Sequence, residues 1–374
     1  MILTILGATG LVGKEIIKIL EEKENKAIKK IIFVATEKSK GNKIKYKNKE
    51  YNVVTVDQAL KQKPTHALFS AGAKASKKYA KEFNKIGAIV IDNSSAFRMK
   101  KNIKLIVPEI NGKTISKKDK IISNPNCSTI QLIMAIAMIQ KKIGIKRIVI
   151  STYQSVTGTG VAAVEQMNKE REGQDVEKVY PYPIDLNCFP HGGDFMENGY
   201  SSEEMKLVNE TRKIFNDPSI QITSTVVRIP VIGGHSEAVN VELHNDFNLD
   251  TVKKEIENTP GVVLQDDLKN NLYPMPLTAH EKNEFQTVIV QRRSMHLIKD
   301  YKKGEEINIK DVFPLRPSPA GSVQPYEIKK LKKDTKTKIP LPLILTGWWE
   351  TNMEDKRQRF LEEHRAMGET CASR

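Results

Sequence analysis

The chain has 374 residues, of which 39% are hydrophobic and 28% charged, so it is a folded protein with room for two or three domains. Its formal net charge is +15, yet aromatic residues make up only 6% and no nucleic-acid-binding motif is present. A generally basic surface, able to attract phosphorylated small molecules, is therefore favoured over a nucleic-acid partner. No apolar stretch approaches the roughly 20 residues needed to cross a bilayer, so a membrane protein is not expected.

Short apolar runs alternate with helical patterns through the first 110 residues. Strands with nearly continuous apolar character, alternating with helices, predict a parallel, doubly wound α/β sheet. The strands are expected at residues 2–6, 31–36, 66–71 and 88–93, and the helices at residues 11–23 and 74–85.

The pattern changes after residue 125, where longer β-rich runs mix with helices. This α+β character predicts a second domain over residues 126–284, which ends in a polar connector at 276–284. A third, β-rich sequence pattern follows over residues 285–350. The charged tail at 351–374 is expected to be a frayed helix or disordered. In the second domain, strands are expected at residues 148–156, 223–232 and 238–244, and helices at 161–170 and 201–215.

The sequence GATGLVG places three glycines directly after an expected strand and at the start of an expected helix. Glycines there allow a tight turn and let backbone N–H groups approach a pyrophosphate at the helix N-terminus. A plain strand–helix turn is the alternative, but the order of strand, loop, helix and second strand favours a Rossmann-like nucleotide-binding domain over residues 1–125. The cofactor-binding loop residues are Gly7, Thr9, Gly10, Leu11, Val12 and Gly13.

The end of the second expected strand indicates which dinucleotide binds. An NAD site usually has an acidic residue there, whereas this chain offers Thr36, Lys38 and Ser39, followed by further lysines. Hydroxyl and ammonium groups suit a 2′-phosphate, so NADP is the expected cofactor. Glu37 leaves NAD open as the alternative, because its carboxylate could reach a ribose hydroxyl.

Cys127 is the candidate nucleophile, since it lies just after Pro125 and just before a long apolar helical pattern. A helix N-terminus lowers the pKa of a cysteine and enriches the thiolate. The alternative is an inert buried cysteine, but the polar neighbours Asn124, Asn126 and Ser128 argue against it. The remaining cysteines, Cys188 and Cys371, lie far away, so neither a disulfide framework nor a zinc site is expected, and the compartment is expected to be the cytoplasm.

Seven motifs together resemble the aspartate-semialdehyde dehydrogenases: GATGLVG, ALFSAGA, VIDNSSAFRM, VPEIN, SNPNCSTIQ, TYQSVTGTG and RIPVIGGHSE. They occur in family order from residue 1 to about residue 283. The resemblance implies an NADP-dependent enzyme of lysine, threonine and methionine biosynthesis that converts aspartate 4-semialdehyde and phosphate to 4-aspartyl phosphate. It also implies a homodimer or homotetramer in which residues 126–284 form the catalytic and dimerisation domain.

The resemblance assigns individual roles to residues of this chain. Without the resemblance, a surface salt bridge explains Arg98 as well as phosphate binding does, and it explains Lys206 better. His235 alone could be an inert core histidine. The implied roles are Cys127 as nucleophile, His235 as acid/base, Gln154 orienting the substrate, Arg228 binding its α-carboxylate, Arg98, Asn126 and Lys206 binding phosphate, Glu203 on the same substrate helix, and Thr157 and Gly158 near the nicotinamide.

The chain departs from the family after about residue 284, where a final helix enclosing the nicotinamide is expected and is not found. From residue 286 to 350 the sequence instead resembles the small antifreeze-like (SAF) domain that ends sialic-acid synthases. Such an atypical C-terminus would weaken the activity. Two hypotheses therefore stay open: a dehydrogenase, or a non-catalytic dehydrogenase-like scaffold whose SAF-like module binds a sugar or a partner protein.

Overall fold

A computed structural model describes residues 1–276, apart from residues 24 and 268, together with residues 294–297 and 312–315. The chain divides into two compact units, Met1–Val290 and Gln291–Arg374. Strands β12 (Ser294–Leu297) and β13 (Val312–Leu315) of the second unit pair in antiparallel fashion. The other residues of the expected SAF-like module, most of the connector and the whole charged tail lie outside the described residues.

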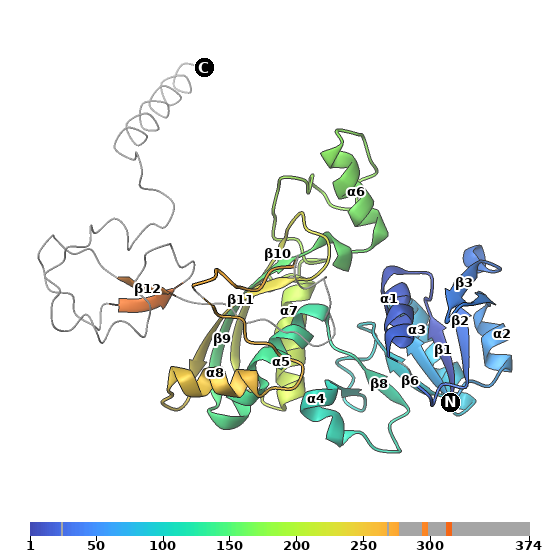
Figure 1. Cartoon of the computed structure of the whole chain (residues 1–374), viewed down its shortest axis with the longest axis horizontal. Helices are drawn as coiled ribbons and strands as arrows, with labels where there is room; N and C mark the ends of the chain where they lie inside the picture. Colours follow the sequence, from blue (N-terminus) through green and yellow to red (C-terminus); the bar gives the residue numbers. More distant parts are fainter. Residues whose placement is uncertain (24, 268, 277–293, 298–311, 316–374) are drawn as a thin grey trace, which may run out of the picture. The chain divides into compact units, whose positions relative to one another are not determined.

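Six parallel strands form the first sheet in the order β2-β1-β5-β6-β8-β7, which confirms the predicted parallel α/β domain (Figure 1). The strands are β1 (Ile2–Leu6), β2 (Lys30–Val34), β5 (His66–Phe69), β6 (Ile89–Asp92), β7 (Lys104–Leu105) and β8 (Ile121–Ser123).

This sheet is covered on both faces because neighbouring residues of its strands point in opposite directions. Ile5 and Phe33 lie in one buried cluster with Ile17 of α1 (Leu11–Glu22). Leu6 and Val34 lie in another, with residues of α2 (Val56–Lys61) and α3 (Gly72–Lys85). The nearly continuous apolar sequence of the central strands follows from this burial on both sides.

A hairpin of β3 (Lys43–Tyr46) and β4 (Lys49–Asn52) was not expected from this lysine-rich segment. Its two-residue turn has positive φ angles at Lys47 and Asn48, as type I′ turns require. Tyr46 and Tyr51 hold the hairpin on the domain, with ring centroids 6.1 and 5.5 Å from Phe33. Isolated side chains, the two tyrosines and Ile44, therefore anchor it, rather than a run of apolar residues.

The second sheet has three strands in the order β10-β9-β11, with β10 (Gln221–Arg228) parallel and β11 (Ser236–Leu243) antiparallel to β9 (Ile145–Gln154). This mixed sheet confirms the expected α+β character. Helices pack on one face of it, where Ile148 and Ile150 enter the core (Figure 1). The helices of this domain are α5 (Cys127–Lys142), α6 (Val161–Arg171), α7 (Ser202–Phe215) and α8 (Leu249–Glu257), and the short α4 (Pro108–Asn111) precedes them.

The opposite face of this sheet carries Val149, Ser151 and Tyr153 of β9, and Tyr153 is 42% exposed. Among the described residues, α5 and α7 contact the sheet, and their core residues cluster with Ile148 and Ile150 on the other face. The described part of the chain also has no helix that is both long and apolar enough to cross a membrane.

Candidate active site

The glycine loop between β1 and α1 needs glycine at two positions for steric reasons. Gly7 has a φ of +92°, and a Cβ there would lie 2.8 Å from the backbone of Ser70. A Cβ on Gly13 would lie 2.1 Å from the carbonyl oxygen of Gly7. No side chain caps the first turn of α1, which begins after Gly10, so its backbone N–H groups remain available to a phosphate.

A hollow of about 410 Å³ opens beside this loop, between α1 and β3. Thr9 and Lys14 line it on one side and Lys43 and Lys45 on the other. Thr36 precedes the short helical turn Glu37–Ser39 at the end of β2, and Glu37 forms an exposed ion pair with Lys40 at 3.6 Å. The loop residues 7–13 and the residues 36–39 expected to bind the cofactor thus lie at the ends of β1 and β2, and three lysines line the hollow.

Cys127 is the first residue of α5, and its Sγ lies 3.2 Å from Nε2 of His235. The two residues are 108 positions apart in the sequence. Asn126 caps the helix, because its side-chain oxygen accepts the N–H groups of Ser128 and Thr129. The Ser155 N–H donates to Nδ1 of His235 at 3.0 Å, which places the proton of the neutral imidazole on Nε2, facing the sulfur.

The pKa of Cys127 corrects the expectation of a thiolate-rich helix N-terminus. Solvent reaches the thiol, but the protein packed around it raises its pKa to about 11, and the Glu203 carboxylate adds to this. The Ser128 N–H and the Arg98 guanidinium lower that pKa without reversing the balance. Burial, with a contribution from the Arg228 charge, lowers the pKa of His235 to about 4. At neutral pH the resting pair is therefore a thiol beside a neutral imidazole.

Arg228 and Gly158 lie next to this pair. Arg228 is 6% exposed, donates from one terminal nitrogen to the Ser155 carbonyl at 2.8 Å, and lies over the ring of Tyr180 at 5.8 Å. Within the described residues its buried Nε has no hydrogen-bond partner. A Cβ on Gly158 would approach Nε2 of His235 to 3.3 Å and the Arg228 guanidinium to 3.6 Å. A glycine here therefore keeps the space between them open.

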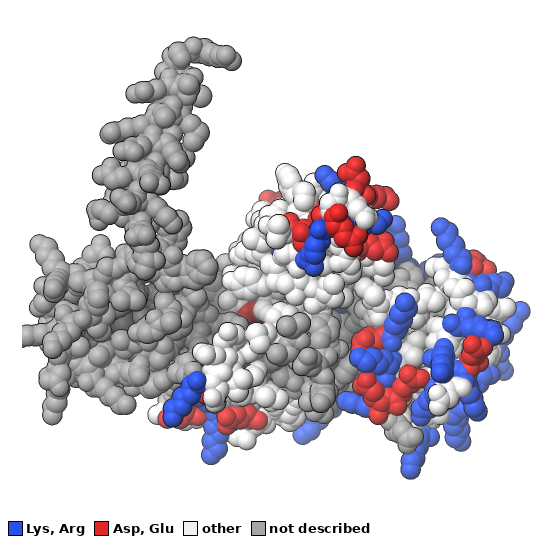
Figure 2. Space-filling model, turned by 45° about the horizontal axis from the view of Figure 1, so that its top comes forward, with Lys and Arg blue, Asp and Glu red and all other residues white. Residues whose placement is uncertain are grey.

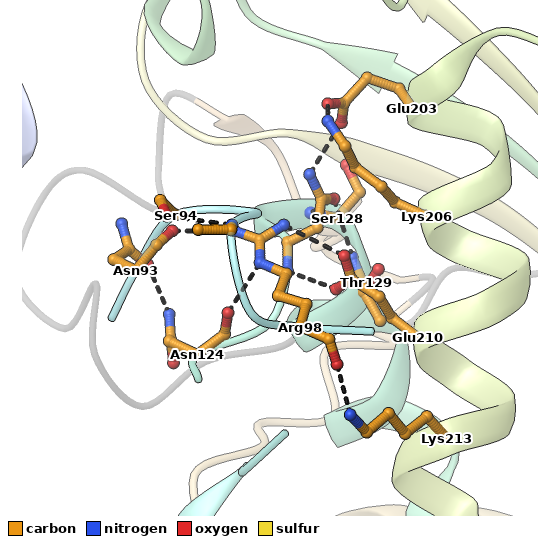
Figure 3. A network of polar contacts seen from close by, with 12 residues as sticks. Asn93, Ser94, Arg98, Asn124, Ser128, Thr129, Glu203, Lys206, Glu210 and Lys213 are labelled. Atoms are coloured by element: carbon orange, nitrogen blue, oxygen red, sulfur yellow. Dashed lines mark hydrogen bonds and ion pairs between the residues drawn. The ribbon is translucent and has the colours of Figure 1, made fainter. Parts of the chain in front are cut away.

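A polar network of buried and partly buried residues meets the start of α5 at Asn126 (Figure 3). Asn126 donates from its side chain to Glu203 at 2.7 Å, and Glu203 forms an ion pair with Lys206. Arg98 forms an ion pair with Glu210 at 3.1 Å, with both side chains less than 10% exposed. The network joins the loop after β6, the start of α5 and one face of α7.

Most of the residues predicted from sequence for catalysis and substrate binding are thus brought together around Cys127. Gln154 contacts the same helix, since its side-chain nitrogen donates to Ser128 Oγ at 2.7 Å. Thr157 accepts the Gly233 N–H at 2.9 Å and so fixes the loop before His235. The residues that sequence reasoning missed are Ser155, Tyr180, Glu210 and Lys213.

Comparisons with known proteins identify the family to which the chain belongs. Two family models match, "Semialdehyde dehydrogenase, NAD binding domain" over residues 3–118 and "Semialdehyde dehydrogenase, dimerisation domain" over residues 136–298. The aspartate-semialdehyde dehydrogenase of Aquifex aeolicus is 43% identical over 75% of this chain and 85% of its own length, and that of Bacillus subtilis is 40% identical over 75% and 84%. The crystal structure of aspartate-semialdehyde dehydrogenase II from Vibrio cholerae superposes with a TM-score of 0.71 at 38% identity, covering 76% of this chain and 86% of that one. A second structure of the Vibrio enzyme, complexed with ASA, matches with the same TM-score. These matches end at residue 298, so the SAF-like module stays a prediction.

Proposed function

The chain belongs to the aspartate-semialdehyde dehydrogenase family, and from that premise we propose how its own residues carry out a phosphorylating, NADP-dependent oxidation of aspartate 4-semialdehyde. The observation that carries the proposal is the contact of 3.2 Å between Cys127 Sγ and His235 Nε2 at the start of α5. A scaffold without activity would have no need to hold a cysteine and a histidine in this arrangement, so the geometry favours the enzyme over the non-catalytic alternative.

Cys127 is the proposed nucleophile. Its thiol proton leaves to solvent, and the thiolate adds to the aldehyde carbon, which turns the carbonyl oxygen into an oxyanion. The Nε2–H of His235 shares its proton with this oxygen as the thiohemiacetal forms and recovers it as the carbonyl re-forms. The Cys127 N–H, for which the described residues show no acceptor, lies at the positive end of α5 and can stabilise the same oxygen.

NADP, when bound, supplies the acceptor for the hydride that leaves the thiohemiacetal carbon. Loss of that hydride converts the adduct to a thioester on Cys127. A phosphate oxygen then attacks the thioester carbon, the C–S bond breaks, and the Cys127 thiolate leaves with 4-aspartyl phosphate as product. Arg98 and Lys206 would hold the phosphate dianion beside the thioester, and Asn126 would donate to it from the helix cap.

Arg228 is proposed to bind the α-carboxylate of the substrate. Its Nε is buried without a partner among the described residues, which favours a ligand that completes its hydrogen bonds. The Vibrio relative was solved in complex with ASA, which supports a substrate site in this chain. Gln154 and Glu203 complete the pocket, with Gln154 orienting the substrate.

The glycine cradle at Gly7 and Gly13 fits a dinucleotide, since only a residue without a side chain leaves room for the close backbone approach. We propose NADP rather than NAD, with Thr36, Lys38 and Ser39 at the 2′-phosphate. The exposed ion pair of Glu37 with Lys40, at 3.6 Å, partly neutralises the carboxylate that an NAD site would use, which favours NADP. Thr157 and Gly158 would lie near the nicotinamide, because they border the Cys127–His235 pair.

A homodimer is proposed through the face of the second sheet that carries Val149, Ser151 and Tyr153, which lies in the segment matched as a dimerisation domain. The occupant would be the same face of a second copy. Val149→Arg should halve the molar mass measured by light scattering, because an arginine directed into a sheet-to-sheet contact cannot be solvated there. An unchanged mass would place the interface elsewhere.

The function is tested by following reduction of NADP with aspartate 4-semialdehyde in the presence and absence of inorganic phosphate. We expect turnover that requires both substrates. A parallel titration with sialic acid addresses the alternative: binding of the sugar without any dehydrogenase turnover would support the scaffold hypothesis.

A further inference from the structure

Helix α7 carries two charged residues to which the proposed reaction gives no role, Glu210 and Lys213. They continue the spacing of Glu203 and Lys206, so all four residues lie along one face of the helix. Figure 3 shows this face turned toward Arg98 and the start of α5. The first two residues of the row were assigned to the substrate site, which raises the question of what the second two do.

The Glu210 carboxylate has two different partners, one for each oxygen. Oε1 pairs with the Arg98 guanidinium at 3.1 Å, and Oε2 accepts the backbone N–H of Asn126 at 2.7 Å. Asn126 is the cap residue directly before Cys127. The side chain of Glu210 is only 1% exposed, so water cannot replace either contact.

The orientation of Arg98 depends on Glu210. Its other two contacts are to backbone carbonyls, from Nε to Asn124 and from the second terminal nitrogen to Asn93, each at 2.9 Å. Three of the five N–H donors of the guanidinium are thereby used. The remaining two are the donors with which Arg98 can hold a phosphate, and their direction is fixed by the three contacts.

Lys213 holds the backbone of the segment that carries Arg98. Its Nζ donates to the carbonyl oxygens of Arg98 at 2.5 Å, Lys100 at 2.9 Å and Ile103 at 2.8 Å. These three bonds use all the donors of an ammonium group, so Lys213 has none left for a substrate. Glu210 thus fixes the guanidinium of Arg98, and Lys213 fixes its main chain.

We propose that Glu210 and Lys213 are positioning residues that together set the geometry of the phosphate subsite relative to Cys127. Glu210 does so by joining the phosphate-binding arginine and the first turn of α5 through one carboxylate. The inference rests on the proposed function, because it takes Arg98 as a phosphate ligand. It predicts that loss of Glu210 impairs the use of phosphate far more than the use of the aldehyde.

The test compares Glu210→Gln with Glu82→Gln in the full chain. The amide keeps the shape of Glu210 but has only one acceptor oxygen, so it cannot serve both Arg98 and the Asn126 N–H. Glu82 is the matched control, because its pair with Lys85, at 3.2 Å, is exposed on α3. We expect the KM for phosphate to rise about tenfold or more in Glu210→Gln, as for one misdirected charge-assisted hydrogen bond, with a KM for the semialdehyde near that of the parent.

A second measurement does not depend on turnover. Inorganic phosphate is titrated for protection of Cys127 against iodoacetamide, read from the mass of the peptide that contains Cys127. The half-protecting concentration should rise in Glu210→Gln in step with the KM for phosphate. Lys213→Met should show a smaller rise in both, and it serves as the informative variant if Glu210→Gln does not fold.

A double-mutant cycle with Arg98→Lys separates the inference from the proposed function. If Glu210 acts through Arg98, the double variant should use phosphate about as poorly as Arg98→Lys alone, because the two changes remove the same geometry. The inference would be overturned, and the function left intact, by either of two results. One is a double variant in which the effects of the two substitutions on the phosphate KM multiply. The other is a Glu210→Gln variant with the parent's phosphate KM and protection. An Arg98→Lys variant that binds phosphate like the parent would remove Arg98 as a phosphate ligand and, with it, the inference.

Discussion

The two domains of the first unit use their charges differently. Residues 1–120 contain 27 basic and 11 acidic residues, whereas residues 121–290 contain 15 and 22. Figure 2 shows the basic side chains of the first domain crowded on its surface. Pairs such as Lys43–Glu50 are more than 60% exposed on both sides, whereas Glu210 of the second domain forms an almost completely buried pair with Arg98 at the reaction centre.

This contrast indicates two different roles for charged residues. An exposed excess of lysine acts at a distance and raises the local concentration of an anionic cofactor, an effect that salt screens. A buried pair acts over one hydrogen bond, sets the direction of a side chain, and is screened little. On this view the chemistry depends on the buried groups, and cofactor selection depends on the exposed ones.

The largest effect is expected for Cys127→Ser. Because the thiolate forms both the thiohemiacetal and the thioester, turnover should fall below about one thousandth of the parent. NADPH binding, measured by fluorescence titration, should stay near the parent value, since Cys127 lies outside the glycine loop. Turnover at the parent rate would remove Cys127 from its role.

His235→Ala should lower kcat by about 10²- to 10⁴-fold, the usual range for a positioned acid or base. The substitution removes the Nε2–H that faces the reacting oxygen and leaves the cap of α5 in place. Steady-state kinetics in both directions measure the loss. A kcat within a fewfold of the parent would make His235 a structural residue.

Sequence patterns predicted the first domain well because its signals are local. The β1–α1–β2 order and the glycines at 7, 10 and 13 lie within 34 consecutive residues. The β3–β4 hairpin was missed because charged residues interrupt both strands and its hydrophobic anchors are isolated ones, Tyr46, Tyr51 and Ile44.

The reaction centre was predicted less completely. Ser155 orients His235 through its main-chain N–H, which no residue pattern reveals. The direction of the Cys127 pKa was wrong because it depends on burial and on Glu203, which are set by tertiary packing. Glu210 could have been found, since it lies four residues after Lys206 on the same helix face.

The pKa of Cys127 gives a prediction about pH. Between pH 7 and 9 the thiolate fraction of a group with a pKa of about 11 rises tenfold for each pH unit. The rate of Cys127 alkylation by iodoacetamide should therefore rise about 100-fold over this range without reaching a plateau, whereas free cysteine, with a pKa of about 8.5, begins to level off. A plateau near pH 7 would indicate that the helix N-terminus outweighs burial after all.

The smallest effect is expected at the exposed charge of Lys38. Lys38→Glu places a carboxylate where the 2′-phosphate of NADP is proposed to bind, so the preference for NADP over NAD should fall about tenfold, the scale of one charge-assisted contact near the surface. Because Lys38 is exposed, the loss should shrink when NaCl is raised from 50 to 500 mM, as screening weakens both the parent's attraction and the variant's repulsion. Glu210→Gln, assayed for phosphate over the same salt range, should keep its defect relative to the parent, because its contacts are buried. Ratios of kcat/KM for the two cofactors at each salt concentration measure the first effect. A parent that uses NAD and NADP equally would contradict the cofactor proposal. A Lys38→Glu defect that does not change with salt would show that this lysine acts through a direct contact of fixed geometry, as the buried pair of Arg98 and Glu210 does.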